Sequence, residues 1–510
     1  MPPITIFLPY SSEDYFPHIV NQFSESPFVE KIIAAHGGEF FCPSQKCAGM
    51  KVNGLTSGAT WNALIRRVKT KYLLVITEAQ SITLNQAALE RFYAVARDTH
   101  AGMLYSDFYE MKEGIRSDHP TIEYQLGSIR DNFDFGAVLF FSMASVRHAV
   151  KKYGTIDSVH HAGYYDLRLK LSVDHDIFHV QEYLYTKTES NNRSSGEIQF
   201  EYVDPRNKKV QQEYEKVATK HLKNIGAYLK PKTMKTPISK NGYNSEISVV
   251  IPVRNRQKTI ADAIKSVLSQ QTAFRFNLIV VDNHSTDATA AIVRTFAETD
   301  THVHLLCPTR EDLSIGGCWN EAVLYPECGR YAVQLDSDDM YSGTDTLQKI
   351  YDVFTKDKCA MVIGSYTLVN SNLEVIPPGL IDHKEWTPHN GRNNALRVNG
   401  LGAPRAFDTA ILRTILLPNT SYGEDYAVAL RISREYRIGR IYRSIYYCRR
   451  WEDNTDAALP LEKINRNDFY KDKIRTIEIL ARIQKNKEAK TTNGKASSSS
   501  ITLNSFSILT

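Results

Sequence analysis

The sequence lacks the features that mark secreted, disulfide-stabilised and membrane-spanning proteins. No apolar run approaches the ~20 residues that span a bilayer, and residues 1–9 have neither the basic region nor the long apolar region of a signal peptide. Only 7 cysteines occur in 510 residues. Cys42 and Cys47 form the one close pair, and no second pair completes a zinc site. These absences predict a reduced, cytoplasmic protein.

An excess of charge of one sign is also missing. The 62 Lys and Arg residues outnumber the 57 Asp and Glu residues by only 5, so we expect no broad basic surface and no nucleic-acid partner. No G-x-G-x-x-G follows an apolar run, and no P-loop, H-E-x-x-H or G-x-S-x-G sequence occurs. A dehydrogenase is therefore disfavoured.

The sequence does contain a regular alternation of apolar runs and amphipathic segments in its second half. Runs of strand length occupy residues 247–253, 276–281, 331–335 and 361–363. Residues 258–270, and those from 287 onward, carry apolar side chains at helical spacing. This alternation predicts an α/β fold with a mostly parallel sheet covered by helices on both faces. Ligands of such sheets bind at the carboxyl ends of the strands.

Five short stretches of the first half recur in the same order in the second half, which indicates a duplicated domain. The offset between them grows from 243 residues (Ile4 to Ile247) to 261 residues (Leu169 to Leu430). The paired stretches are 4–9 with 247–252, 58–63 with 316–321, 71–79 with 330–338, 169–172 with 430–433, and 183–185 with 444–446.

We predict four segments along the chain. A first domain covers residues 1–200, and a second covers 246–484. Residues 201–245 form a connector, in which the Lys-, Glu-, Gln- and Ala-rich stretch 208–229 is typical of a helix. Residues 485–510 are rich in Lys, Thr and Ser and are predicted to be a disordered tail.

The most distinctive polar group follows the apolar run 331–335. Asp336, Asp338 and Asp339 lie within four residues of one another, and their negative charges repel. A divalent cation that also binds substrate phosphates would relieve this repulsion. The alternative is a solvated acidic turn that caps the next helix.

Polar residues also follow two other predicted strands. Asp282 ends a buried run and needs a partner, which a nucleobase edge or a ribose hydroxyl can supply. The residues after it, 285–287, are explained equally well as a helix cap. Pro252 ends the other run, and Arg254 or Arg256 beyond it can face phosphates or remain simply exposed.

A pair of carboxylates, Glu424 and Asp425, opens a helical stretch. The helix dipole favours negative charge at this position, which explains the pair without any function. The functional interpretation makes one of the two a general base.

These motifs, in this order and spacing, resemble a family 2 glycosyltransferase domain of the GT-A type over residues 246–455. The matching segments are Val250-Ile251-Pro252, Val281 to Asp287, Leu335 to Asp339, and Glu424-Asp425. The resemblance implies a GT-A-type, mostly parallel sheet sandwiched by helices. Together with the internal repeat, it implies two tandem GT-A-like domains.

The resemblance also implies a reaction and the residues that carry it. The reaction is a metal-dependent, inverting transfer of a sugar from a nucleotide-diphosphate sugar, typically a UDP-sugar, to a hydroxyl of a glycan or lipid-linked acceptor in polysaccharide biosynthesis. Asp425 is the implied base, and Asp336 and Asp338 are the implied ligands of Mg²⁺ or Mn²⁺. The implied nucleotide-sugar pocket contains Pro252, Val253, Arg254, Asn255, Asp282, Gly317, Asn320, Asp336 and Ser337. The implied acceptor side contains Gly402, Ala403, Arg405, Glu424, Arg450 and Trp451.

The sequence departs from the family pattern at several positions. His284 stands where the family usually has Gly, and Asn283 replaces its second Asp, so the identity of the base stays open. Tyr447 stands where processive members have Gln. Trp451 either stacks on a sugar or belongs to the core.

The first half resembles a degenerate copy of the same domain. Thr77-Glu78-Ala79 replaces the metal motif, and Ile32 to Ala35 contains no Asp opposite Asp282. Gly163 and Tyr164 fall opposite Glu424 and Asp425. These changes favour a non-catalytic module for docking, acceptor binding or dimerisation over a second active transferase.

Two other functions stay open for the whole chain. One is a non-catalytic protein that binds a glycan or a nucleotide-sugar, and the other is a nucleotidyltransferase on a related fold. Peripheral association with the inner face of the plasma membrane and formation of a homodimer also stay open.

Overall fold

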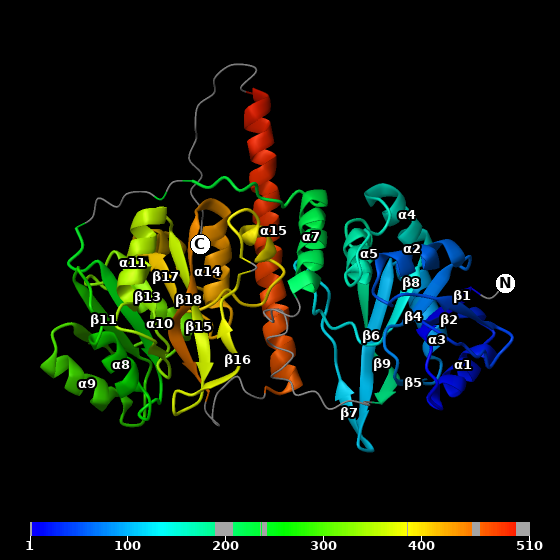
Figure 1. Cartoon of the computed structure of the whole chain (residues 1–510), viewed down its shortest axis with the longest axis horizontal. Helices are drawn as coiled ribbons and strands as arrows, with labels where there is room; N and C mark the ends of the chain where they lie inside the picture. Colours follow the sequence, from blue (N-terminus) through cyan, green and yellow to red (C-terminus); the bar gives the residue numbers. More distant parts are fainter. Residues whose placement is uncertain are drawn as a thin grey trace.

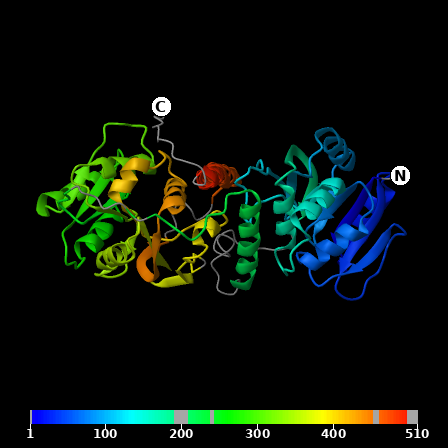
Figure 2. The same cartoon turned by 90° about the horizontal axis from the view of Figure 1, so that it is seen from above.

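The computed structural model describes residues 3–188, 208–234, 236, 242–384, 386–450 and 459–495. These residues form two α/β domains that lie side by side (Figure 1). Two helices, α7 (Lys208–Asn224) and α15 (Leu461–Lys495), stand between the two domains in both views (Figures 1 and 2).

The N-terminal domain has a mixed, mostly parallel sheet with helices on both faces. Its strands are β1 (Ile4–Pro9), β2 (Val29–His36), β3 (Cys47–Lys51), β4 (Tyr72–Ile76), β5 (Ser81–Leu84), β6 (Met103–Lys112), β7 (Ile115–His119), β8 (Val138–Ser142) and β9 (Ile177–Thr188). Its helices are α1 (Tyr15–Glu25), α2 (Gly58–Arg67), α3 (Ala88–Thr99), α4 (Met143–Tyr153) and α5 (Gly163–Leu171).

The C-terminal domain repeats this arrangement. Its strands are β10 (Ile247–Val253), β11 (Phe276–Asp282), β12 (Val303–Leu306), β13 (Tyr331–Gln334), β14 (Met340–Tyr341), β15 (Met361–Val369), β16 (Val375–Ile381), β17 (Arg405–Asp408) and β18 (Ile438–Arg449). Its helices are α8 (Ile260–Leu268), α9 (Thr289–Thr299), α10 (Ile315–Leu324), α11 (Thr346–Asp357), α12 (Gly391–Asn394), α13 (Thr409–Ile415) and α14 (Glu424–Glu435).

The two sheets have the same strand order, so the prediction of two tandem GT-A-like domains is confirmed. Among the described residues the first sheet runs β3-β2-β1-β4-β8-β6-β9-β5, with β7 paired to β6. The second runs β12-β11-β10-β13-β17-β15-β18-β14, with β16 paired to β15. Adding nine to each strand number of the first sheet gives the second, and a coincidence of this length is not expected from unrelated folds.

The Gly-x-x-Trp-Asn repeat has the same structural task in both domains. The Asn62 side chain of α2 both donates to the carbonyl of Ile156 (2.9 Å) and accepts from its N–H (3.0 Å). Asn320 of α10 makes the same pair of bonds with Leu417, at 2.9 and 2.8 Å. Each asparagine therefore fastens its helix to the loop that precedes α5 or α14.

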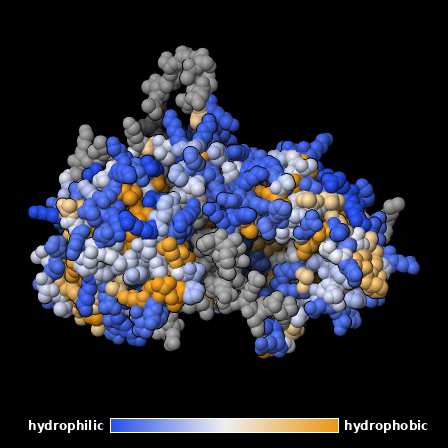
Figure 3. All heavy atoms as spheres, viewed as in Figure 1, coloured by the Kyte–Doolittle hydropathy of each residue, from blue (hydrophilic) through white to orange (hydrophobic). Residues whose placement is uncertain are grey.

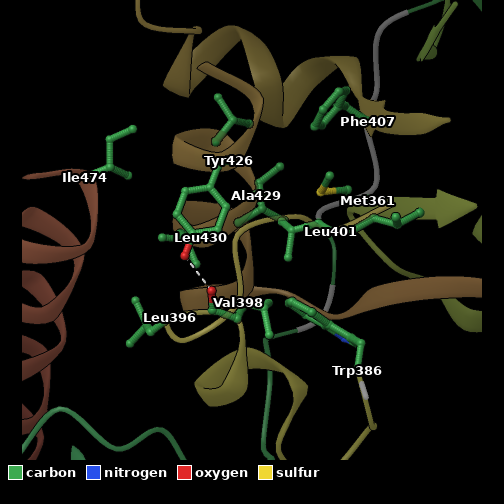
Figure 4. Close-up of a cluster of buried hydrophobic side chains, with 14 of the residues drawn as sticks. Met361, Trp386, Leu396, Val398, Leu401, Phe407, Tyr426, Ala429, Leu430 and Ile474 are labelled. Carbon is green, nitrogen blue, oxygen red and sulfur yellow. Dashed lines mark hydrogen bonds between the residues drawn. The ribbon is translucent and has the colours of Figure 1, made fainter. Parts of the chain in front are cut away.

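Apolar strands explain why each sheet is covered on both faces. In β10, Ile247, Val249 and Ile251 face one buried cluster, while Val250 faces the other. The cluster around Val250 continues beyond the C-terminal domain, because it also contains Val217 of α7 and Ile129 of the N-terminal domain. Figure 4 shows part of it, with Ile474 of α15 facing the side chains of α14. The two domains therefore share one continuous apolar core.

The strands and helices predicted for the second half are present, with boundaries shifted by a few residues. Residues 258–270 contain α8, and the helix predicted from residue 287 is α9, with the Asp287 carboxylate accepting from the N–H of Thr289 at 2.9 Å. The predicted connector helix is α7.

The prediction of a disordered tail from residue 485 is wrong for residues 485–495, which continue α15. Asn486 donates to the carbonyls of Gly226 (2.7 Å) and Tyr228 (2.9 Å), and Lys485 pairs with Glu435. The Lys-rich composition of residues 485–495 thus belongs to a helix that neighbouring segments hold in place. Residues 496–510, the rest of the predicted tail, lie outside the described residues.

The surface in the view of Figure 3 is mainly hydrophilic, with separate apolar patches. Within the described ranges, every helix is too short or too polar to traverse a bilayer.

Replacing Gly316 with Ala should destabilise the protein. An added Cβ would lie 1.8 Å from the carbonyl oxygen of Pro418, so α10 and the loop before α14 must separate. Overpacking of this kind costs about 1–3 kcal/mol. Gly38 is the matched control, because a Cβ there meets nothing within 4 Å. Denaturant unfolding of both variants tests the prediction, and equal midpoints for Gly316→Ala and Gly38→Ala would contradict it.

Candidate active site

Three neighbouring parallel strands bring the predicted nucleotide and metal residues to one edge of the second sheet. In the ladder of β10 and β11, Val253 pairs with Asp282. In the ladder of β10 and β13, Val250 pairs with Gln334, so Asp336 follows the end of β13. Asp282, Pro252 and Asp336 therefore lie along the carboxyl edge, as the sequence predicts for a parallel sheet.

A cavity of about 170 Å³ opens at this edge. Five polar side chains from three separate parts of the chain line it: Gln334 and Asp336 from β13 and its end, Arg405 from β17, and Glu424 and Asp425 from α14. Apolar side chains of α10, β17 and the loop before α14 complete the lining, namely Ile315, Trp319, Phe407 and Leu417.

Asp336 is the carboxylate of the predicted metal motif that lines the cavity. Its Oδ1 accepts from Nε2 of Gln334 at 2.8 Å, and its backbone N–H donates to the hydroxyl of Tyr446 at 3.1 Å. Desolvation raises the pKa of Asp336 above its usual range, although the Arg405 charge and the Gln334 hydrogen bond partly offset the effect. A buried carboxylate of this kind is stabilised by any cation that enters the cavity.

Asp338 and Asp339 differ from each other in exposure and in role. The Asp338 side chain is 26% exposed and lies 3.7 Å from Nε of Arg256. Asp339 is buried, its Oδ1 accepts from the N–H of Arg449 at 2.8 Å, and burial raises its pKa well above the usual value. Asp339 therefore stabilises the acidic turn that follows β13, while Asp338 is accessible to a ligand.

Asp425 is held by contacts to both carboxylate oxygens. Its Oδ2 pairs with Nη1 of Arg405 at 2.5 Å, and its Oδ1 accepts from the N–H of Tyr426 at 2.6 Å. The Oε1 atom of Gln334 accepts from Nε of Arg405 at 3.0 Å and so fixes the guanidinium group. This chain of contacts fixes the orientation of the Asp425 carboxylate in the cavity.

Glu424 lies beside Asp425 but in a different electrostatic environment. Its Oε2 is buried and has no hydrogen-bond partner within the described part of the chain. Desolvation, together with the negative charge of Asp425, raises the pKa of Glu424 to about 8. Glu424 is therefore mainly protonated at neutral pH, so the first turn of α14 presents one neutral and one paired carboxyl group.

The end of β11 presents a buried oxygen atom without a partner in the protein. Oδ2 of Asp282 accepts from the N–H of Ser285 at 3.2 Å, whereas Oδ1 is buried and unpaired among the described residues. The neighbouring Asn255 has a left-handed φ of 53°, and its Oδ1 accepts from the N–H of Thr286 at 2.8 Å. This bond ties the loop after β10 to the loop after β11.

Some predicted site residues lie away from the cavity or are used by the protein itself. The polar atoms of Asn320 are bonded to Leu417, and a Cβ on Gly317 would lie 2.4 Å from Oδ1 of Asn419. Both residues thus pack α10 against the loop before α14, and their contact with a nucleotide stays a prediction. Arg254 is exposed.

The predicted acceptor-side residues are only partly described. Gly402 has φ of 102°, and its carbonyl accepts from Nη1 of Arg405 at 3.3 Å, with Ala403 next to it. Arg450 is partly buried, and its N–H donates to the carbonyl of Val369 at 2.7 Å. Trp451 lies outside the described residues.

Sequence reasoning missed three residues that support the site. Gln334 orients both Asp336 and Arg405, and Tyr446 binds the backbone of Asp336. Arg449 reaches the metal motif from β18, where its Nε donates to the carbonyl of Asp338 at 2.5 Å. Gln334 alone had a local signal, as a polar side chain inside an apolar strand. The other two come from a strand more than 100 residues away, which no local pattern connects to the motif.

The N-terminal domain replaces all five polar residues of the cavity. The equivalent strand registers place Leu139 at the position of Arg405, with Val75 and Thr77 at those of Gln334 and Asp336. α5 begins at Gly163 as α14 begins at Glu424, so Tyr164 stands opposite Asp425. The Tyr164 ring lies 5.6 Å from Trp61, and aromatic packing thus occupies the equivalent region.

The strand order of the second sheet and the cavity at its carboxyl edge agree with the GT-A-type domain expected from the sequence. Residues 248–416 match the family model described as "Glycosyl transferase family 2". The matched range includes Asp282, Asp336 and Arg405 and ends before Glu424.

Curated relatives are named glycosyltransferases. The UDP-Glc:alpha-D-GlcNAc-diphosphoundecaprenol beta-1,3-glucosyltransferase WfgD of Escherichia coli is 29% identical over 202 residues, which are 38% of this chain and 72% of that protein. The putative teichuronic acid biosynthesis glycosyltransferase TuaG of Bacillus subtilis is 31% identical over 123 residues, or 24% of this chain. The match covers 47% of TuaG, so this chain spans less than half the length of that relative.

Among solved structures, S. aureus TarS (residues 1–349) is similar with a TM-score of 0.34 and 21% identity, covering 50% of this chain and 76% of that one. Glucosyl-3-phosphoglycerate synthase of Mycobacterium tuberculosis, solved with Mn²⁺ and UDP, has a TM-score of 0.32 and 17% identity, covering 49% of this chain and 86% of that one.

The raised pKa of Glu424 predicts how its glutamine variant behaves. Near pH 7, Glu424→Gln should keep activity within about threefold of the wild type, because a neutral amide replaces a carboxyl group that is already mainly protonated. Above pH 8, the wild-type Glu424 ionises and the variant does not, so the two pH profiles should diverge. The measurement is the release of nucleoside diphosphate from pH 6 to 9.

The matched control is Asp425→Asn, the same change at the adjacent residue. It should lower the rate by about 10²–10⁴-fold if Asp425 is a general base. Equal losses for the two variants at pH 7 would contradict this division of roles.

Proposed function

We propose that this chain transfers a sugar from a UDP-sugar to a hydroxyl of a cell-wall glycan or a lipid-linked glycan, with inversion at the anomeric carbon. The observation that carries the proposal is the cavity at the carboxyl edge of the second sheet, where Asp336, Arg405 and Asp425 meet in a family 2 domain. The names of two relatives, a glucosyltransferase acting on a diphosphoundecaprenol-linked sugar and a putative teichuronic acid glycosyltransferase, support this acceptor class.

The unpaired Oδ1 of Asp282 supports binding of the nucleobase at the end of β11. A buried acceptor without a partner carries a cost that an N–H donor from a ligand removes. The imide N–H of uracil is a donor of this kind. Pro252, Val253 and Asn255 at the end of β10 would line the adjacent part of the pocket, with Ser337 on the other side.

The donor set of the metal motif fits Mg²⁺ or Mn²⁺. These cations prefer oxygen ligands and commonly use one or two carboxylates together with substrate phosphates, and Asp336 and Asp338 offer two carboxylates in one turn. The raised pKa of Asp336 supports this role, because a nearby cation would stabilise the ionised form. When bound, the cation would neutralise the negative charge that develops on the diphosphate.

Asp425 would take the proton of the acceptor hydroxyl as its oxygen attacks the anomeric carbon. The new bond joins that oxygen to the sugar, while the bond from the sugar to the diphosphate breaks and its electron pair leaves with the nucleoside diphosphate. Arg405 holds one oxygen of Asp425 and so fixes the orientation of the base. Glu424, protonated beside it, can donate a hydrogen bond to the sugar or the acceptor.

The alternatives are a non-catalytic binding protein and a nucleotidyltransferase. The five polar side chains of the cavity, all present in the second domain and all replaced in the first, favour catalysis in the second domain. Release of free UDP with transfer or hydrolysis of the sugar separates the three functions, because a binding protein releases none and a nucleotidyltransferase releases pyrophosphate.

We expect UDP-glucose or UDP-N-acetylglucosamine to raise the thermal unfolding midpoint of the wild type in the presence of Mn²⁺. Binding at a hundredfold excess over Kd stabilises the folded state by about 2.7 kcal/mol. Asp338→Asn should lose most of the Mn²⁺-dependent part of this shift, together with UDP release. A screen of UDP-, GDP- and CDP-sugars with and without Mn²⁺ provides the measurement.

The control for charge alone is Asp312→Asn, because Asp312 is exposed and pairs only with Arg310 in the described structure. It should keep both the shift and the activity. The proposal is wrong if no nucleotide-sugar shifts the wild-type midpoint and no sugar donor is cleaved.

A further inference from the structure

The last helix of the C-terminal domain is fastened to the N-terminal domain by a set of polar contacts. The Ser128 hydroxyl donates to Oδ2 of Asp472 in α15 at 2.9 Å, and Nε of Arg130 lies 3.3 Å from both carboxylate oxygens of Asp472. Arg130 also pairs with Asp468 at 3.1 Å. Gly127 packs so closely that a Cβ would lie 2.1 Å from the carbonyl oxygen of Asp472.

The centre of this contact is a buried ion network. Asp472 and Arg475 have fully buried side chains, and the Arg130 side chain is 2% exposed. Nη1 of Arg475 donates to Oδ1 of Asp472 at 2.7 Å. A buried carboxylate between two guanidinium groups has few alternative arrangements, because moving any member leaves a charge unpaired inside the protein.

From Arg475 the network reaches two segments, each of which leads to a partner of Asp425. Its Nε donates to the hydroxyl of Tyr426 at 3.1 Å, and its Nη2 donates to Oδ1 of Asn399 at 2.6 Å. Tyr426 follows Asp425 directly, and its N–H is a partner of the Asp425 carboxylate. Asn399 precedes the loop that leads to Arg405, the other partner of Asp425.

Helix α15 also contacts the residues around the first turn of α14 through Lys471 and Ile474. Nζ of Lys471 donates to the carbonyl of Asn399 at 2.7 Å and lies 4.4 Å from the centre of the Tyr422 ring. A Cβ on Gly423 would lie 3.1 Å from Cδ1 of Ile474. Figure 4 shows Ile474 beside α14, and the dashed line there marks the bond from the Tyr426 hydroxyl to the carbonyl of Ala395 (2.5 Å).

The contacts between the domains follow an approximate twofold symmetry. Leu139 and Arg405 are equivalent in the strand registers, and the same offset relates Asp131 to Arg397, which pair across the interface at 2.7 Å. In the other direction, α7 of the first copy contacts Arg397 through Gln211 at 2.7 Å. The last helix of the first copy, α7, thus contacts the loop before β17 of the second copy. The last helix of the second copy, α15, contacts the loop before β8 of the first copy, as in an isologous dimer.

We propose that the N-terminal domain acts as a positioning module for the base helix: Ser128 and Arg130 hold Asp472, Asp472 holds Arg475, and Arg475 fixes Tyr426 and Asn399 in the two segments that lead to the partners of Asp425. The catalytic copy is therefore complete only with the copy that has lost its own site. This inference rests on the proposed function, in which Asp425 is the base. Arg130, Asp472 and Arg475 are positioning residues, since none lines the cavity.

The first test is Arg130→Lys, which keeps the charge but loses the planar group that reaches Asp472 and Asp468 together. With UDP-glucose and Mn²⁺, we expect kcat for UDP release, calculated per donor-binding site, to be at least tenfold lower than in the wild type. The Kd of the donor should stay within twofold of the wild-type value. Active sites are counted by calorimetric titration of UDP-glucose, so a partly unfolded sample does not imitate the effect. Unchanged kcat per site in the folded variant would overturn the proposal.

Ser128→Ala is the milder second variant, because it removes a single hydrogen bond to Asp472. It should lower kcat by a few-fold in the same direction, and it keeps the test decisive if Arg130→Lys does not fold. The control is Gln125→Ala, which removes a solvent-exposed contact between the domains, the 3.1 Å bond from Nε2 of Gln125 to the carbonyl of Phe469 on α15. The control should leave kcat and Kd unchanged.

Hydrogen exchange gives a readout that needs no substrate. Amides of residues 424–428, at the start of α14, should exchange faster in Arg130→Lys than in Gln125→Ala, while those of β10 and β11 stay the same. Equal protection of α14 in the two variants would overturn the proposal even if the enzyme proves inactive on every donor. Conversely, a wild type that binds and cleaves no nucleotide-sugar, with α14 loosened in Arg130→Lys, would contradict the proposed function and leave the positioning of the helix intact.

Discussion

The buried carboxylate of Asp472 between Arg130 and Arg475 is the contact on which the arrangement of the whole molecule depends. It joins three parts of the chain that are far apart in sequence: a loop of the first domain, the last helix, and the helix that carries Asp425. Since an unpaired charge in this environment is costly, the three parts keep one relative position. The orientation of the candidate base is in this way linked to a domain whose own cavity residues have been replaced.

The duplication explains why such a contact exists. Two copies of one fold pack through equivalent loops and through their last helices, and Asp131 and Arg397 mark the axis that relates them. An interface of this kind resembles that of a symmetric dimer, with the partner fused into the same chain. Once the interface stabilises the catalytic copy, the cavity of the N-terminal copy is dispensable, whereas the fold of that copy is not. Val75, Leu139 and Tyr164 can then pack in an apolar and aromatic cluster, where the C-terminal copy keeps polar groups.

Much of the fold was predictable because its signals are local. The runs 247–253 and 276–281 are apolar on both faces, and only buried parallel strands require this pattern. Five stretches that recur in the same order indicated the duplication. In one of them, residues 58–63 and 316–321, Asn62 and Asn320 fasten the equivalent loop in each copy. Residues 485–495 were wrongly predicted to be disordered, because a Lys-, Thr- and Ser-rich composition does not reveal the contacts of Asn486 with Gly226 and Tyr228. Long-range partners decide whether a polar segment folds.

The sequence by itself determined the residue types at the ends of the strands, and with them the class of chemistry: carboxylates after β11 and β13 and at the start of α14. Only the tertiary structure decided how far each carboxylate is buried and which groups it contacts. Glu424 and Asp425 are neighbours of the same chemical kind, yet Glu424 is desolvated, with one oxygen that has no partner among the described residues, whereas Asp425 is paired with Arg405. The physical reason is that charge state depends on burial and on neighbours brought together from distant parts of the chain, and neither is encoded in a motif.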